Sequence, residues 1–130
     1  MALRKNKLIS FSQKMKGYHN YDLNICFEVN KANLKIIVTN EILIEHFSKG
    51  TINESWIQST YEIHRLFSKI LPVGYTKNDD LEFKNGKYFI NSCLKFKKYK
   101  IALFVWFRLF LIKPISRFHL SLLKKIITRC

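Results

Sequence analysis

The sequence predicts an α+β fold: a small, mostly antiparallel sheet with two to three helices on one face and basic terminal extensions. Apolar and polar residues alternate over 21–29, as expected for a half-buried strand. Asn-Gly at 85–86 lies within a second alternating stretch, 81–90, and this dipeptide favours the type I′ turn of a β-hairpin. A Thr-x-x-Glu capping box at 51–54 precedes an apolar repeat with helical spacing.

The first half of the chain is predicted to hold two strands and two helices. The strand at 21–29 is followed by a polar turn and a second strand at 34–38. Asn40 can cap a short helix that ends at Gly50. The helix after the capping box stops at a proline and a glycine, and its apolar stripe contains Trp56, Ile57, Tyr61, Phe67, Ile70 and Leu71.

The second half is predicted to hold the hairpin, a long strand and a helix. In the hairpin register, Phe83 lies opposite Tyr88. Residues 101–112 are apolar except for Arg108, and their β-branched and aromatic content favours a buried strand, although periodicity does not exclude a helix. This run is shorter than the ~20 residues that a membrane-spanning helix needs. Pro114 suits the first turn of a final basic amphipathic helix.

The length of 130 residues suits one domain with basic extensions. The predicted organisation is a basic N-terminal arm (1–17), an α+β core (18–96), and a basic apolar strand with a C-terminal amphipathic helix (97–130). Residues 1–16 also resemble a basic targeting peptide.

The formal net charge is +14, and the excess lies at the two ends of the chain. Residues 1–17 and 95–130 contain basic residues and no acidic ones, whereas the middle is nearly neutral. This asymmetry predicts basic segments that bind phosphates or anionic lipid. The predicted nucleic-acid-binding residues are Arg4, Lys5, Lys7, Lys95, Lys97, Lys98, Lys100, Lys113, Arg117, Lys124 and Lys125.

The composition indicates an AT-rich gene. Lys, Ile, Asn, Phe and Tyr, whose codons are rich in A and T, account for 61 of the 130 residues. Such genes occur in organelles, endosymbionts and some phages. The preference for Lys over Arg therefore carries little functional information, whereas the absence of acids from both ends does.

No motif predicts an enzyme, a cofactor or a small-molecule substrate. Cys26, Cys93 and Cys130 are isolated, which argues against a zinc site and suits a reducing compartment. A cysteine could pair with one of the histidines as a nucleophile, but small core residues are the simpler interpretation. The histidines are His19, His46, His64 and His119.

One acidic stretch is reminiscent of metal-dependent nucleases, in which carboxylates hold Mg²⁺ and a lysine activates water. Asp79 and Asp80 precede a Glu-x-Lys formed by Glu82 and Lys84. In the predicted hairpin, Lys84 and Lys87 lie beside Glu82 and are sufficient to explain it. No metal site is therefore predicted.

Two resemblances to known families add to this interpretation. Ile112-Lys113-Pro114, Phe118, residues 121–124 and Ile127 resemble the end of the tenth protein of the small ribosomal subunit, whose strand ends in Ile-x-Pro before a closing helix. Other matching positions are Ser92 with Lys97, Lys98 and Lys100, for that family's RNA-facing loop, and Ile70-Leu71-Pro72 with Thr76-Lys77. The resemblance covers roughly residues 70–127 and implies binding to ribosomal RNA.

The middle of the chain, from Phe27 to Phe96, is similar to a short bacterial family of the YrdB type. The matching features include Trp56, His64-Arg65 and the Asn-Gly pair at 85–86. The function of that family is unknown, so this resemblance implies no activity.

The function predicted from these observations is structural and RNA-binding: a small-subunit ribosomal protein encoded by an AT-rich organelle genome. Its partners would be ribosomal RNA and neighbouring ribosomal proteins, and Phe96, Tyr99 or Trp106 could stack on bases. The location would be a mitochondrial ribosome or the cytoplasm of an AT-rich bacterium. The alternative is a peripheral membrane protein that docks through the basic amphipathic segment 101–127.

Overall fold

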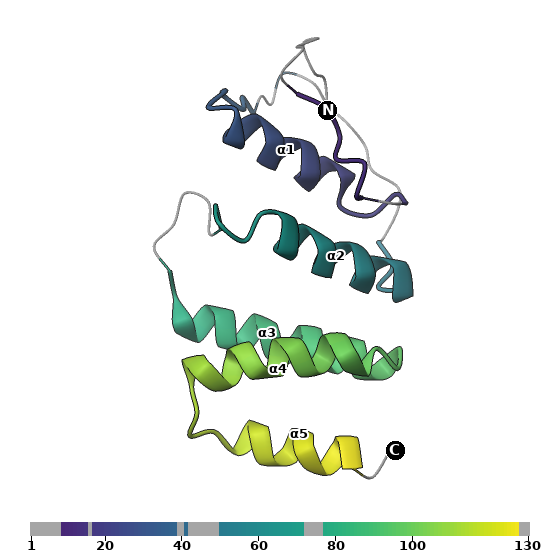
Figure 1. Cartoon of the computed structure of the whole chain (residues 1–130), viewed down its shortest axis with the longest axis vertical. Helices are drawn as coiled ribbons and strands as arrows, with labels where there is room; N and C mark the ends of the chain where they lie inside the picture. Colours follow the sequence, from purple (N-terminus) through teal and green to yellow (C-terminus); the bar gives the residue numbers. More distant parts are fainter. Residues whose placement is uncertain (1–8, 16, 39–40, 42–49, 72–76, 128–130) are drawn as a thin grey trace. The chain divides into compact units, whose positions relative to one another are not determined.

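The computed structural model describes residues 9–15, 17–38, 41, 50–71 and 77–127, and the regular secondary structure of these residues is α-helical. Within these residues, five α-helices follow one another (Figure 1): α1 (Tyr21–Lys31), α2 (Glu54–Leu66), α3 (Asp79–Lys95), α4 (Tyr99–Ile112) and α5 (Arg117–Ile127). They belong to two compact units, an N-terminal unit (1–73) and a C-terminal unit (74–130). The boundary lies inside the stretch 18–96, for which the sequence predicts a single core.

The predicted α+β fold is wrong, because the described residues contain no β-strand and hence no sheet. The stretches 21–29 and 101–112 are helix, and the stretch 34–38 is exposed and has no regular secondary structure. The predicted hairpin at 81–90 lies inside a helix. The helix expected between Asn40 and Gly50 lies outside the described residues.

Helix α1 replaces the strand predicted from the alternating pattern. Ile25 and Val29 are buried, whereas Tyr21 and Leu23 are exposed. Residues four apart share a helix face as well as a strand face, so the buried pair fits either structure. A strand would have buried Tyr21 and Leu23 too, whereas the helix buries Asn24 instead.

The turn predicted at 30–33 exists, but it ends a helix rather than joining two strands. Asn33 has a φ of 56°. Its N–H donates to the Asn30 carbonyl at 2.9 Å, and the Leu34 N–H donates to the Val29 carbonyl at 3.0 Å. These two bonds form a Schellman motif, in which asparagine is one of the few residues that tolerate the left-handed conformation.

Polar contacts join α1 to α2 within the N-terminal unit. The side-chain amide of Asn20 donates to the hydroxyls of Ser59 at 3.2 Å and Thr60 at 3.1 Å. The Ser59 hydroxyl donates to the His19 carbonyl at 2.6 Å. Beside them, the rings of Phe27 and Phe67 lie 4.9 Å apart. The start of α1 is therefore fixed by side chains of α2 rather than by a cap of its own.

Helix α2 confirms the predicted second helix, with a different cap. The Asn53 side chain, not that of Thr51, accepts a hydrogen bond from the Trp56 N–H at 2.9 Å. Ile57 and Phe67 of the predicted stripe are buried, and Ile63 is buried with them. An asparagine cap stabilises a helix start about as well as the threonine of a capping box.

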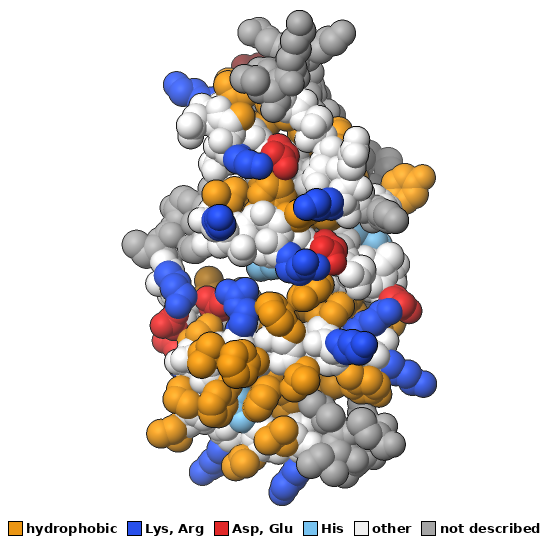
Figure 2. All heavy atoms as spheres, viewed as in Figure 1, with side chains coloured by type: hydrophobic (Ala, Val, Ile, Leu, Met, Phe, Trp, Pro, Cys, Tyr) orange, Lys and Arg blue, Asp and Glu red, His pale blue; other side chains and the backbone are white. Residues whose placement is uncertain are grey.

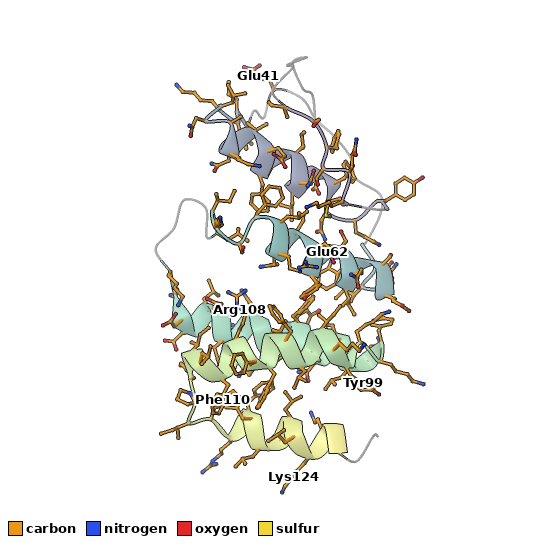
Figure 3. The ribbon with its side chains drawn as sticks, in the orientation of Figure 1. Glu41, Glu62, Tyr99, Arg108, Phe110 and Lys124 are labelled. Carbon is orange, nitrogen blue, oxygen red and sulfur yellow. The ribbon has the colours of Figure 1, made fainter. Side chains whose placement is uncertain are left out.

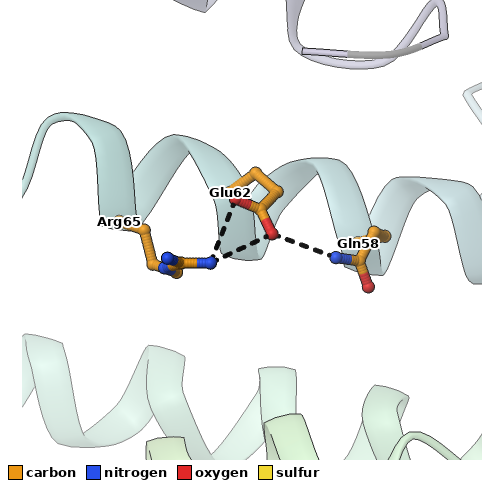
Figure 4. A network of polar contacts seen from close by, with 3 residues as sticks. All are labelled: Gln58, Glu62 and Arg65. Atoms are coloured by element: carbon orange, nitrogen blue, oxygen red, sulfur yellow. Dashed lines mark hydrogen bonds and ion pairs between the residues drawn. The ribbon is translucent and has the colours of Figure 1, made fainter. Parts of the chain in front are cut away.

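Arg65, beside His64 on α2, belongs to a small polar network on the exposed side of the helix (Figure 4). Its guanidinium lies 3.5 Å from Glu62, which also accepts from the Gln58 amide at 3.1 Å. Exposed pairs of this kind contribute little to stability. The network adds local support to α2 and no chemistry.

Helix α3 contains the Asn-Gly pair in its middle. A Cβ on Gly86 would lie 2.6 Å from a methyl carbon of Leu109 on α4. The glycine therefore provides room for close packing between α3 and α4, not a positive φ for a turn. Asn78 caps α3 by accepting a hydrogen bond from the Leu81 N–H at 2.9 Å. Three acids in the first turn stabilise the helix through its dipole, which is positive at the N-terminus.

Helix α4 is the apolar run 101–112 with two further residues, and it replaces the predicted buried strand. It pairs with α3, and Ile101, Ala102 and Leu109 are buried. Helix α5 confirms the predicted closing helix, but it begins at Arg117 rather than at Pro114. Leu122 is buried in the C-terminal unit, whereas Ile115 precedes the helix and is 99% exposed.

The strand that the ribosomal resemblance implies before Pro114 is thus replaced by α4. Among the described residues, none of the helices combines the length and the apolar character needed to cross a bilayer.

Candidate nucleic-acid interface

The acids of the C-terminal unit lie at the first turn of α3, and each has a cation nearby. Lys77 lies 3.0 Å from Asp79, and Arg108 of α4 lies 3.3 Å from Glu82. Lys113, just after α4, forms an ion pair with Asp80. Because α3 and α4 form an antiparallel hairpin, the end of α4 reaches the start of α3 (Figure 3).

These pairs change the titration of two of the groups. The hydrogen bond and charge of Lys113 lower the pKa of Asp80. The hydrogen bond and charge of Asp79 raise the pKa of Lys77. Both shifts favour the ionised forms at neutral pH, so this end of the hairpin consists of opposite charges in contact. Lys113, one of the predicted nucleic-acid-binding residues, is engaged in the ion pair with Asp80.

The same contacts explain the nuclease-like acids, although not by the predicted route. Glu82 is paired with Arg108 from α4 rather than with Lys84 or Lys87. Asp79 and Asp80 have their own lysines. In the described part of the chain, no group of three or more His, Cys, Asp or Glu side chains could hold a metal ion.

The opposite end of the hairpin carries four lysines and no acid. They lie at the end of α3, in the turn and at the start of α4: Lys95, Lys97, Lys98 and Lys100. Lys95, Lys97 and Lys100 are exposed, and Lys98 is half-buried. We call these four residues the basic turn.

Two backbone hydrogen bonds define the conformation of the basic turn. The Lys98 N–H donates to the Cys93 carbonyl at 2.8 Å, and the Lys97 N–H donates to the Leu94 carbonyl at 3.2 Å. Lys97 has a φ of 56°, so a lysine occupies the left-handed position of a Schellman motif where glycine is the usual residue. The turn that presents the lysines is therefore hydrogen-bonded rather than an open loop.

Aromatic side chains accompany the basic turn. The ammonium of Lys95 lies 5.5 Å from the centre of the Phe96 ring, and Phe96 and Tyr99 are half-buried. Trp106 lies farther along α4, with its ring 5.7 Å from Phe110 and its indole N–H buried. Phe96 and Tyr99 remain candidates for base stacking, whereas Trp106 belongs to the packing against α5.

The other predicted binding residues are distributed more widely. Arg4, Lys5 and Lys7 lie outside the described residues. Arg117, Lys124 and Lys125 are exposed on α5. The last turn of α5 lies on the same side of the C-terminal unit as the basic turn (Figure 1).

An aromatic cluster, which no sequence pattern indicated, holds α5 on the hairpin. His119 is buried, and its Nε2 lies 2.7 Å from the Lys113 carbonyl. Its ring makes edge contacts with those of Phe83, Trp106, Phe110 and Phe118, at 5.4–6.1 Å between centres. His119 is therefore a packed core histidine.

The two described cysteines differ in environment. Cys26 is partly exposed, whereas Cys93 is completely buried in α3. Burial raises the pKa of the Cys93 thiol to about 12. Since the thiolate is the nucleophilic form, Cys93 is inert in the folded protein.

This burial predicts how Cys93 reacts. In a Cys26→Ser/Cys130→Ser background, we expect a thiol reagent at pH 8 to modify Cys93 only after the C-terminal unit opens. The measurement is the labelling rate across a urea titration. Rapid labelling of the folded protein at low urea would contradict the burial.

The raised pKa also predicts a loss of stability at alkaline pH. In the unfolded chain the Cys93 thiol titrates near its ordinary pKa of about 8.5. Below that pH the thiol is protonated in both states, and the free energy of unfolding does not depend on its titration. Above it, the unfolded state loses a proton that the folded state keeps, and stability falls by about 1.4 kcal/mol per pH unit until the folded pKa is reached. In Cys93→Ala, the free energy of unfolding measured from pH 8 to 10 should not show this fall.

Comparison of the chain with family models, curated proteins and solved structures found no match.

Proposed function

We propose that the protein binds RNA through the basic turn, as a structural component of a ribonucleoprotein particle. The observation that carries this proposal is the separation of charge along the α3–α4 hairpin. At one end Lys77, Arg108 and Lys113 are paired with acids, and at the other end exposed lysines occur in a part of the sequence, 83–130, that contains no acidic residue.

Lysines grouped on a turn suit a phosphate backbone. Each ammonium that contacts a phosphate releases a counterion, which makes the affinity depend on salt. Phe96 and Tyr99 add flat surfaces on which unpaired bases can stack. Arg117, Lys124 and Lys125 of α5 extend the cationic surface.

The small ribosomal subunit of an AT-rich organelle is the setting that we propose. Support comes from the net charge of +14, the amino-acid composition typical of an AT-rich gene and the residues around Pro114 that resemble the ribosomal family. Ribosomal RNA and neighbouring ribosomal proteins would be the partners. Co-sedimentation with ribosomal particles in high salt tests this setting separately from RNA binding itself.

RNA binding is tested by the salt dependence of affinity for a single-stranded RNA, measured by fluorescence anisotropy. Lys97→Gln/Lys100→Gln is expected to weaken binding and to reduce the slope of log K against log salt by roughly 1.4, because each phosphate contact contributes about 0.7. Glutamine, like lysine, is unbranched at Cβ, so the cost of the left-handed conformation at residue 97 should be similar for the two residues.

A matched control removes the same charge from the other end of the hairpin. Lys77→Gln/Lys113→Gln has the same net charge as the test variant, but its lysines are already paired with Asp79 and Asp80. We expect its slope to remain near that of the unmodified protein. Equal slope changes in both variants would mean that net charge alone drives binding. The proposal that RNA binds at the basic turn would then be wrong.

A further inference from the structure

Helix α4 presents a broad apolar face to solvent on the side away from its buried residues. The exposed residues are Leu103 (53%), Phe104 (47%), Phe107 (57%), Phe110 (39%) and Leu111 (68%). Their spacing of one, three and four residues places them on one side of the helix. Ala102 and Leu109, on the other side, are buried in the C-terminal unit. Large apolar side chains gathered in this way mark an interaction surface.

Helix α5 extends the apolar face. Leu120 is 68% exposed and Leu123 is 40% exposed, whereas His119 and Leu122 are buried. In Figure 2, hydrophobic side chains gather over α4 and α5, and Lys and Arg side chains lie around them. We call the exposed apolar residues of α4 and α5 the apolar face.

The charges around the apolar face are positive. Lys100 lies on α4, where Arg108 is paired with Glu82 of α3, and Arg117, Lys124 and Lys125 lie on α5. The sequence has no Asp or Glu after Glu82, so neither helix contributes an acid. An apolar centre with a cationic border is complementary to a surface that offers hydrocarbon below a layer of negative headgroups.

We propose that the apolar face docks α4 and α5, lying in plane, on the surface of an anionic lipid bilayer. A helix of 14 residues is about 21 Å long, short of the ~30 Å hydrocarbon core, so α4 lies on the membrane rather than across it. The side chains of the apolar face enter the headgroup boundary, and the border cations bind lipid phosphates. The apolar residues of this surface are separate from the basic turn, although its cationic border shares Lys100 with that turn, and the inference does not depend on RNA binding.

The test uses the full chain with vesicles of phosphatidylcholine alone or mixed with phosphatidylglycerol, and measures the fraction that sediments with lipid. We expect binding to the anionic vesicles, with much weaker binding to phosphatidylcholine alone. Phe107→Ser/Leu111→Ser should lower the partition coefficient at least about tenfold, because two large apolar side chains are lost from the contact. Both are exposed, so helical content measured by circular dichroism should not change.

The matched control changes two exposed apolar residues of α3, Leu81 and Tyr88. Leu81→Ser/Tyr88→Ser is expected to leave the partition coefficient within about twofold of the unmodified value. RNA affinity measured on the same variants separates the two proposals, because Phe107→Ser/Leu111→Ser should leave the salt slope unchanged.

Any of three results would overturn membrane docking. The first is a lack of binding to anionic vesicles, and the second is an equal loss of binding in the α3 control. The third is a concentration-dependent dimer, detected by analytical ultracentrifugation, that Phe107→Ser/Leu111→Ser abolishes. In that case the apolar face would be covered by a second copy of the chain.

Discussion

Replacing Leu109 with alanine is expected to lower the free energy of unfolding of the C-terminal unit by about 2–5 kcal/mol. Leu109 is 2% exposed and packs against the backbone of α3 at Gly86. Truncation would leave a cavity that the two helix backbones cannot close without moving. Trp56 and Trp106 are the two tryptophans, so urea unfolding followed by fluorescence in a Trp56→Phe background reports on the C-terminal unit.

The partner substitution, Gly86→Ala, tests the same contact from α3. Overpacking costs about 1–3 kcal/mol, whereas alanine improves helix propensity by about 1 kcal/mol, so a net loss of roughly 1 kcal/mol is expected. Asn85→Ala, at an exposed position of the same helix, is the control and should be neutral or stabilising.

The double variant Gly86→Ala/Leu109→Ala should be less destabilised than the sum of its single variants, because the new methyl group occupies part of the cavity. Strict additivity would contradict the close approach of the two helices at this point.

Phe83→Ala is expected to destabilise the C-terminal unit by about 3–5 kcal/mol. The Phe83 ring is buried and makes edge contacts with Phe118 at 6.0 Å and His119 at 5.8 Å. The ammonium groups of Lys87 and Lys113 lie 5.2 and 5.6 Å from its centre. Alanine would remove the contacts that hold α5 on the hairpin as well as those within it.

The control for Phe83 is Phe107→Ala, which removes a ring of the same size from an exposed position of α4. Its effect should stay within about 0.5 kcal/mol. The transition measured by Trp106 fluorescence should therefore shift to lower urea for Phe83→Ala only. Similar shifts for both variants would show that the aromatic cluster does not carry the packing of α5.

The helices that can be predicted from the sequence are those with two agreeing signals. Helix α2 has an N-terminal cap and a 3.6-residue apolar repeat, and α5 separates its cations from its buried leucine. The strand prediction for α1 is wrong because its buried pair, Ile25 and Val29, also matches an alternating pattern. What separates helix from strand here is the exposure of Tyr21 and Leu23, which depends on tertiary packing.

The two errors in the C-terminal unit have a common cause. Asn-Gly at 85–86 favours a turn when only neighbouring residues are considered, but Leu109, 23 positions farther along, is what makes Gly86 useful in α3. The run 101–112 is β-branched and aromatic, yet it is helical beside α3. Local propensity is overridden in both places by packing between segments distant in sequence.

The candidate site is predictable as a set of residues but not as an arrangement. The acid-free stretch is enough to include Lys95, Lys97, Lys98 and Lys100 among the eleven predicted binding residues, but not to separate them from the others. The pairing of Lys113 with Asp80 depends on the antiparallel course of α4 and cannot be deduced from spacing. The left-handed conformation of Lys97 is likewise hidden in the sequence, since glycine is the residue usually expected there.

The distribution of charge along the α3–α4 hairpin has a consequence for the approach to a partner. Acids lie at the start of α3 and lysines surround the turn at its far end, so the hairpin has an electric moment along its axis. In the field of a polyanion this moment exerts a torque that turns the lysine end forward before contact. The encounter is then oriented by long-range attraction, and the fraction of productive collisions falls as added salt shortens the range of the field.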